Sequence, residues 1–245
     1  MITIHASAVC RVRDGYTGRP LAGSALLCTL DGAPVRPLAK AGGYLVLLDL
    51  SPGQHRLSLR SHGYQEEWVD LTAGEGTQEV EVTMKPGAGY PFRGRVTRLE
   101  LTVTEDGRPA PHRQLWLAVP PRSELKIAQT KVQGGEVQFR LYSKAPAATV
   151  PPGEYLIADG DGSEIVRLRG IEEELGILAA PLARDHSRGR PLLPAQRYRT
   201  DQGGRLTAVL QTACTVEVYE ETAGLLASLP LEEGENRQEI RWKTL

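Results

Sequence analysis

Four things are scarce in this sequence of 245 residues: aromatic side chains, cysteines, long apolar runs and an excess of charge of either sign. Lys and Arg number 29 against 30 Asp and Glu, so no strong positive field exists to attract a nucleic acid. No stretch of about 18 apolar residues occurs, which excludes a membrane-spanning helix. We therefore expect a soluble protein with neither nucleic acid nor the membrane interior as a partner.

The three cysteines, Cys10, Cys28 and Cys214, form an odd and sparse set that predicts no disulfide framework. Cys10 and Cys28 lie in apolar, strand-like runs, and we interpret them as buried free thiols. A Cys10–Cys28 disulfide in an oxidising compartment is the alternative. The N-terminal residues lack the basic segment and apolar core of a signal peptide. These features predict cytoplasmic synthesis, with release by lysis if the chain is assembled into a particle.

Glycine and proline are abundant by contrast, at 26 and 17 residues, and they are spread along the chain as expected for many short segments joined by turns. Between these turns apolar and polar residues alternate with period two, which is typical of strands with one buried face. Asp31-Gly32 and Pro52-Gly53 fit tight turns between such strands. The sequence therefore predicts an all-β fold of tandem small antiparallel β-sandwiches, transthyretin-like or immunoglobulin-like.

The alternation is interrupted after Met84 by a stretch rich in Gly, Pro and Ala, which cannot sustain a strand ladder. We therefore predict a first β-sandwich at 1–86, a linker at 87–94, and a second β-sandwich region with insertions at 95–245. A split of the second region near 170–190 into two β-units is the alternative.

One segment departs from the β pattern. Apolar residues at 171–179 fall at helical spacing, and Glu172, Glu173 and Glu174 lie where the dipole of a helix favours acidic side chains. Gly176 and Pro181 weaken that reading, so we expect at most one short helix there.

Turn residues recur in a way that suggests an internal repeat. Gly18-Arg19-Pro20 has a counterpart in Gly107-Arg108-Pro109, and Gly42-Gly43-Tyr44 has one in Gly134-Gly135-Glu136. This alignment puts the extra residues of the second copy mostly at 142–149. A weaker echo, Gly189-Arg190-Pro191 followed by Gly203-Gly204-Arg205, either starts a third unit or completes the second.

The order of turn motifs in the first region points to a known family. The motifs are Gly18 to Gly23, Gly43 to Leu47, Leu50 to Leu57, and His62-Gly63-Tyr64. With them, residues 9–84 resemble the carboxypeptidase regulatory-like, transthyretin-like β-sandwich family, and the region after 95 resembles it more loosely. Lys40-Ala41-Gly42 departs from the family, in which a Thr-Asp pair often precedes the Gly-Tyr. The resemblance implies a β-sandwich with a non-catalytic binding or structural role.

No motif for catalysis, metal binding or nucleotide binding is complete. Asp159 to Glu164 looks like the start of a calcium loop, but Gly170 stands where the bidentate acid is needed, so a hairpin turn is the better interpretation. Asp185-His186-Ser187 holds the residue types of a hydrolase triad, but sequence neighbours cannot point at one another in the required order. We predict no enzyme, no cofactor, no metal and no catalytic residue. Turnover abolished by changing His112, His186 or Asp159 would contradict this.

Trp68, Trp116 and Tyr64 are the candidate contacts with a ligand or partner, because flat aromatic faces suit both protein interfaces and sugar rings. Trp68 follows the acids Glu66 and Glu67, which favours exposure, whereas Tyr64 follows a family glycine, which favours packing. We weigh packing or a protein interface above carbohydrate binding.

The sequence leads to two functional hypotheses. Sandwiches of a type mostly met outside cells, on a chain without an export signal, suggest a phage-tail-like contractile particle released by lysis. The first hypothesis is a non-catalytic cap, adaptor, decoration or fibre-associated component of such a particle, with other protein subunits as partners. The alternative is a carbohydrate-binding or adhesive surface module.

Overall fold

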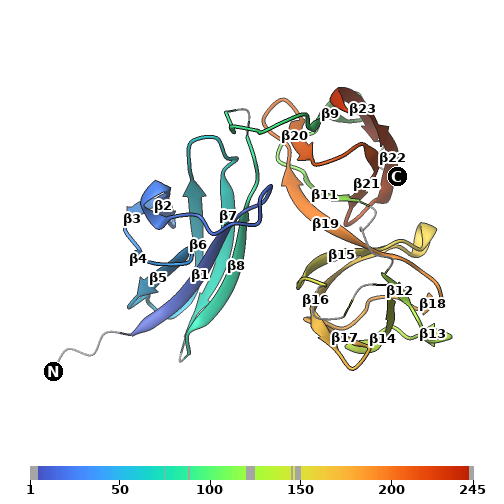
Figure 1. Ribbon diagram of the computed structural model, residues 1–245, viewed down its shortest axis with the longest axis horizontal. Coiled ribbons are helices and arrows are strands. Elements are labelled where there is room, and N and C mark those ends of the chain that lie inside the picture. Colours follow the sequence, from blue (N-terminus) through green and yellow to red (C-terminus); the bar gives the residue numbers. More distant parts are fainter. Residues whose placement is uncertain are drawn as a thin grey trace. The chain divides into compact units, whose positions relative to one another are not determined.

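The computed structural model describes residues 5–74, 76–87, 89–119, 125–144, 146 and 150–242. Apart from two 3-10 turns, at Gly23–Ala25 and Gly160–Gly162, the regular structure of these residues consists of strands, so the predicted all-β class is confirmed (Figure 1). None of the described segments is a helix of the length and apolarity needed to cross a bilayer. Contacts divide the chain into two units, the first running to Val96 and the second holding most residues from Thr97 on.

The first unit is a sandwich of two four-stranded sheets. One sheet has the order β4-β5-β1-β8, formed by Leu38–Lys40, Tyr44–Leu48, Ala6–Asp14 and Gln78–Met84. The other has the order β3-β2-β6-β7, formed by Ala33–Val35, Leu27–Leu30, Gly53–Arg60 and Glu67–Ala73. The predicted Asp31-Gly32 turn joins β2 to β3, with both residues at positive φ.

The core of this first sandwich is built by the period-two alternation of its strands. Cys10 of β1, Leu57 and Leu59 of β6 and Leu71 of β7 are among the side chains that meet between the sheets. Cys10 and Cys28 are both buried free thiols, and burial, together with the nearby Cys28, raises the pKa of the Cys10 thiol to about 11.

Two other segments form backbone hydrogen bonds with the first strand at Val12. Its N–H donates to the carbonyl of Gly43 at 2.8 Å, and its carbonyl accepts from the N–H of Leu21 at 3.0 Å. Gly43 has a φ of 81°, and a side chain there would clash with the Val12 carbonyl oxygen. The conformation and the close approach both require glycine. On the far side, β1 pairs with β8 in parallel, so the first and last strands of the sandwich lie side by side.

The second unit repeats this plan with different strands. Its first strand, β9 (Thr97–Glu105), pairs in parallel with the last strand of the chain, β23 (Gly234–Trp242). The sheet order β19-β11-β21-β22 reproduces β3-β2-β6-β7 of the first unit. These four strands are Leu192–Arg199, Gln114–Ala118, Cys214–Glu220 and Gly224–Leu231.

The second unit also repeats the two backbone hydrogen bonds at the middle of its first strand. Val103 of β9 donates to the Gly204 carbonyl at 2.8 Å and accepts from Ala110 at 3.0 Å. Arg108–Pro109 (β10) and Arg205–Leu210 (β20), which follows Gly204, both pair with β9, on the edge opposite β23. Gly204 is therefore the structural counterpart of Gly43.

This correspondence corrects the repeat inferred from the sequence. Gly203-Gly204-Arg205 completes the second copy, and Gly134-Gly135 is not the counterpart of Gly42-Gly43. The extra residues lie between β11 and β19, not mostly at 142–149, a range that falls partly outside the described residues. The described residues 125–191, called the inserted region below, form the remaining strands (Figure 1). They are β12 (Leu125–Ile127), β13 (Lys131–Val132), β14 (Gln138–Ser143), β15 (Gly153–Ile157), β16 (Glu164–Glu172), β17 (Leu175–Leu178) and β18 (His186–Ser187).

Residues 171–179, for which the sequence predicts at most one short helix, form part of a β-hairpin. β16 and β17 pair with Ile171 opposite Gly176, and Glu173 and Glu174 form the turn at positive φ. β17 also pairs with β14 on its other side. The helical spacing of the apolar residues is overridden because the inserted region offers strand partners on both sides.

Gly204→Ala should lower the free energy of unfolding by at least about 2 kcal/mol, because a Cβ would lie 2.5 Å from the Val103 carbonyl oxygen at a φ of 71°. Gly107→Ala is the matched control: it also has a positive φ but open space around it, so it should cost only about 1 kcal/mol. Urea unfolding followed by circular dichroism measures both. Equal losses would contradict the correspondence of Gly204 with Gly43.

Candidate functional site

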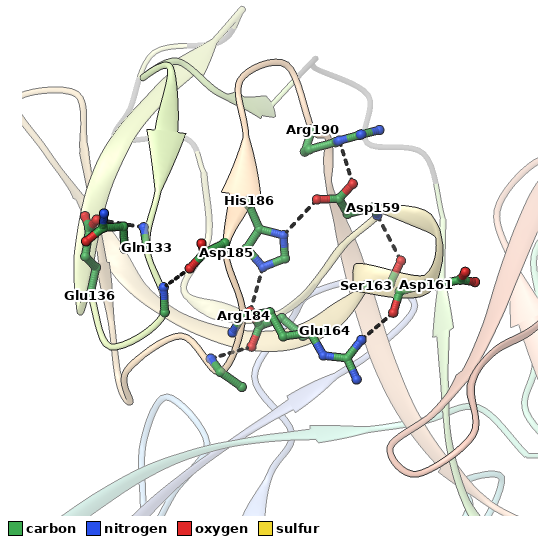
Figure 2. Close-up of polar contacts among 12 residues, drawn as sticks. Gln133, Glu136, Asp159, Asp161, Ser163, Glu164, Arg184, Asp185, His186 and Arg190 are labelled. Carbon is green, nitrogen blue, oxygen red and sulfur yellow. Dashed lines mark hydrogen bonds and ion pairs between the residues drawn. The ribbon is translucent and has the colours of Figure 1, made fainter.

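The inserted region contains a polar network centred on His186 (Figure 2). The His186 side chain is buried, with its Nδ1 3.1 Å from Asp159 Oδ2 and its Nε2 2.6 Å from Glu164 Oε1. Asp159 precedes the 3-10 turn between β15 and β16, and Glu164 is the first residue of β16. The turn at 159–164 and the loop at 185–187, which the sequence suggested separately, thus meet in one network.

Both carboxylates of this network have further partners inside the protein. Arg190 Nε lies 2.7 Å from Asp159 Oδ1, and the N–H groups of Ala183 and Arg184 donate to Glu164 at 2.9 and 3.2 Å. Each ring nitrogen of His186 and each oxygen of the two carboxylates is therefore engaged by protein groups. The network fastens the loop that follows Leu182 to the β15–β16 turn, and it leaves no ring nitrogen available as a general base.

The residue before His186 has partners of its own, away from the imidazole ring. Asp185 turns toward β13, where it accepts from the N–H of Gly134 at 2.8 Å and lies 2.6 Å from Lys131 Nζ. Figure 2 shows Asp185 and His186 engaged on different partners. Among the described residues, no group of three or more His, Cys, Asp and Glu side chains could hold a metal ion.

The electrostatics of the network favour a charged His186. Burial lowers the pKa of His186, but hydrogen bonds to Glu164 and Asp159 outweigh it, and the net effect raises the pKa above its ordinary value. Burial likewise raises the pKa of Glu164, while hydrogen bonds from His186 and Ala183 bring it below its ordinary value. With a carboxylate oxygen at each ring nitrogen, His186 donates both hydrogen bonds only in its protonated form.

The three aromatic candidates lie in different environments. Trp116 is 5% exposed, its Nε1 donates to Glu154 Oε2 at 3.0 Å, and its ring packs edge-on against Tyr219. It belongs to a core cluster with Leu156 of the inserted region. The structure therefore corrects the assignment of Trp116 as a surface contact: the inserted region covers this side chain.

Tyr64 packs within the first unit. Its hydroxyl donates to Asp14 Oδ2 at 3.1 Å, and Tyr90 donates to the same oxygen at 2.5 Å, with the two rings edge-on. Gly63 makes room for this arrangement, since a Cβ there would lie 3.1 Å from the Gly89 carbonyl oxygen. The residues around Tyr90, predicted as a linker, are thus held against the first unit.

Trp68 is exposed, with 43% of its surface accessible, on the outward side of β7. Ser58 of β6 is its cross-strand partner, and ion pairs lie on either side: Arg60–Glu66 at 2.7 Å and Arg56–Asp70 at 2.8 Å. Leu27 of β2 is also outward and is 75% exposed. We call this surface the Trp68 face; it consists of Leu27, Arg56, Arg60, Glu66, Trp68 and Asp70, with Ser58 buried among them and its hydroxyl donating to Glu66.

Comparison with known proteins gives no family assignment. No protein-family model matches the sequence, and no curated protein matches it. Among solved structures, the shaft pilin SpaA from Lactobacillus rhamnosus GG is similar at 9% identity and a TM-score of 0.29, covering 99% of this chain and 98% of that one.

Two further solved structures are similar at the same low level. BcpA, the major pilin subunit of Bacillus cereus, gives 10% identity and a TM-score of 0.27 over 98% of this chain and 99% of that one. The Bacillus anthracis TIE protein gives 11% and 0.26 over 98% of this chain and 50% of that one. TM-scores of this size carry no conclusion about function.

His186→Gln should lower the free energy of unfolding by about 3 kcal/mol at about pH 6, because it removes the cation between the buried carboxylate of Glu164 and the half-buried carboxylate of Asp159. The Glu164 contribution is present above its unfolded pKa and is lost as pH falls through its lowered folded pKa. The His186 contribution is present below its unfolded pKa and is lost as pH rises through its raised folded pKa.

Chemical denaturation across pH measures the difference between the wild-type protein and His186→Gln, which should shrink as the pH is raised from about 6. Asp161→Asn, in the same turn but outside the network, is the control and should change little. A difference that grows with pH would show that His186 is held neutral.

Trp116→Ala should cost about 4 kcal/mol of unfolding free energy, because it empties a buried site and leaves Glu154 without its indole donor. Trp68→Ala should cost less than about 1 kcal/mol, as expected for an exposed side chain. Parallel urea titrations of the two variants check this. Comparable losses would mean that Trp68 has a packing role.

Proposed function

We propose that this chain is a non-catalytic structural module that works through protein–protein contacts, and that the Trp68 face is a contact surface. The observation that carries the proposal is an exposed tryptophan on a regular sheet face, placed between two Arg–carboxylate pairs. Trp and Arg are the residue types most enriched where interfaces concentrate their binding energy. The arrangement supports a protein partner that buries Trp68 and meets both signs of charge around it.

The His186 network supports the non-catalytic part of the proposal. Histidine is the side chain most often used for acid–base chemistry at neutral pH. Here both ring nitrogens are bound to carboxylates that have other internal partners. Such an arrangement serves the folding of the inserted region.

The more specific proposal keeps the hypothesis drawn from the sequence. The first unit would be a carboxypeptidase regulatory-like sandwich, and the chain would act as a cap, adaptor, decoration or fibre-associated component of a phage-tail-like contractile particle, made in the cytoplasm and released by lysis. Its partners would be the other subunits of that particle. The exposed indole of Trp68 also favours a second candidate, a carbohydrate-binding or adhesive surface module, since a flat ring can stack on a sugar.

Co-expression with the proteins encoded by neighbouring genes tests the proposal. A complex that survives size-exclusion chromatography is expected, and Trp68→Ser should weaken it by at least about tenfold in Kd. Tyr142→Ser removes another exposed aromatic residue, in the second unit, and is the matched control. Glycan-array binding that is lost in Trp68→Ser, with no protein complex, would overturn the proposal in favour of the carbohydrate-binding module.

A further inference from the structure

The same face of the sheet is exposed in the first sandwich and covered by protein in the second. Leu27 in β2 and Trp116 in β11 hold equivalent positions, because each follows its Gly-Arg-Pro motif at the same distance and lies on the outward side of its strand. Arg60 is the cross-strand partner of Leu27, and Tyr219 is that of Trp116. In the second unit the inserted region covers this face with Leu156 and Ile165.

The equivalent face of the first unit is the Trp68 face, on which Leu27 and Trp68 are exposed. The second copy of the fold thus shows that this face of the sandwich can take a cover of packed β-structure. Exposed apolar side chains on the uncovered copy point to an interaction surface. The charges of the face indicate which cover fits it.

We propose that the Trp68 face packs against the Trp68 face of a second copy of this chain, through the strands β6 and β7. The inference rests on the proposed function, namely that the chain works through protein contacts, and it names the partner. Two sheets stacked face to face in this way are the ordinary packing of a β-sandwich.

The pattern of residues on β6 and β7 is complementary to itself. Arg56, Ser58 and Arg60 follow one another on the outward side of β6. On β7, Asp70 is the partner of Arg56 and Trp68 that of Ser58, and Glu66, which directly precedes β7, is ion-paired with Arg60. Consider a two-fold axis that lies in the plane of contact, parallel to the strands and midway between β6 and β7. It places β6 of one copy opposite β7 of the other. Each arginine then faces an acid of the other copy, and each Trp68 lies over the position of the small, buried Ser58.

This arrangement brings no like charges together and needs no net charge from the partner. The two arginines and two acids of one face already balance, so a strongly acidic or basic partner would leave charges without counterparts. The contact covers Trp68. Leu27, one strand beyond β6 and paired with Arg60, lies diagonally from Trp68 of the other copy, at the margin of the contact.

The test is the oligomeric state of the full chain by sedimentation velocity over a range of micromolar concentrations. A dimer is expected, and Trp68→Ser should weaken its Kd by at least about tenfold. Arg60→Glu should also weaken it, since like charges then face each other, and Arg60→Glu combined with Glu66→Arg should restore it because the swapped pair is still self-complementary. Tyr142→Ser is the control, and a circular dichroism spectrum of each variant confirms its fold.

A chain that stays monomeric at every concentration would overturn this inference, and so would a dimer that Trp68→Ser and Arg60→Glu leave unchanged. Either result is distinct from failure of the proposed function. A monomer that still binds a co-expressed subunit through Trp68 overturns the second copy as partner but keeps the role in protein contacts. Absence of both self-association and a subunit complex would remove both proposals.

Discussion

The parallel pairing of the first and last strands closes each sandwich, and the rest of the architecture depends on it. β1 pairs with β8, and β9 pairs with β23 along nine residues. Both pairs join strands from opposite ends of a unit, so each rests on contacts of long sequence separation. On the other side of β1 and β9 a glycine carbonyl, from Gly43 or Gly204, accepts from the strand and sets where the next strand begins.

A second pairing, between β11 and β19, explains how the second copy tolerates a large insertion. β11 and β19 are neighbours, with Ala118 opposite Ala195, so the chain leaves and re-enters the sheet at almost the same place. An insertion between ends that already lie together costs little in loop closure. β19 also pairs with β15, so one strand belongs both to the sandwich sheet and to the inserted region. The His186 network then fastens the loop that precedes β19.

The insertion also decides which surfaces are available for contact. It buries Trp116, which would otherwise be an exposed aromatic side chain on the sheet face, and the equivalent face of the first unit keeps Leu27 and Trp68 in solvent. One fold thus presents the same face covered and uncovered within a single chain. The balance of charge on the uncovered face, Arg56 and Arg60 against Glu66 and Asp70, agrees with the balance of the whole sequence.

The sequence by itself determined the features that depend on near neighbours. Period-two alternation defined the all-β class, Asp31-Gly32 and the residues at 159–164 marked hairpin turns, and Gly-Arg-Pro marked the start of each copy. Only the tertiary structure decided the pairings. It made 171–179 a hairpin, matched Gly43 with Gly204, brought His186 to Asp159 and Glu164, and buried Trp116 while leaving Trp68 exposed. Turn chemistry and alternation are local, but strand partners and buried charge pairs form across long sequence separations, where spacing gives no signal.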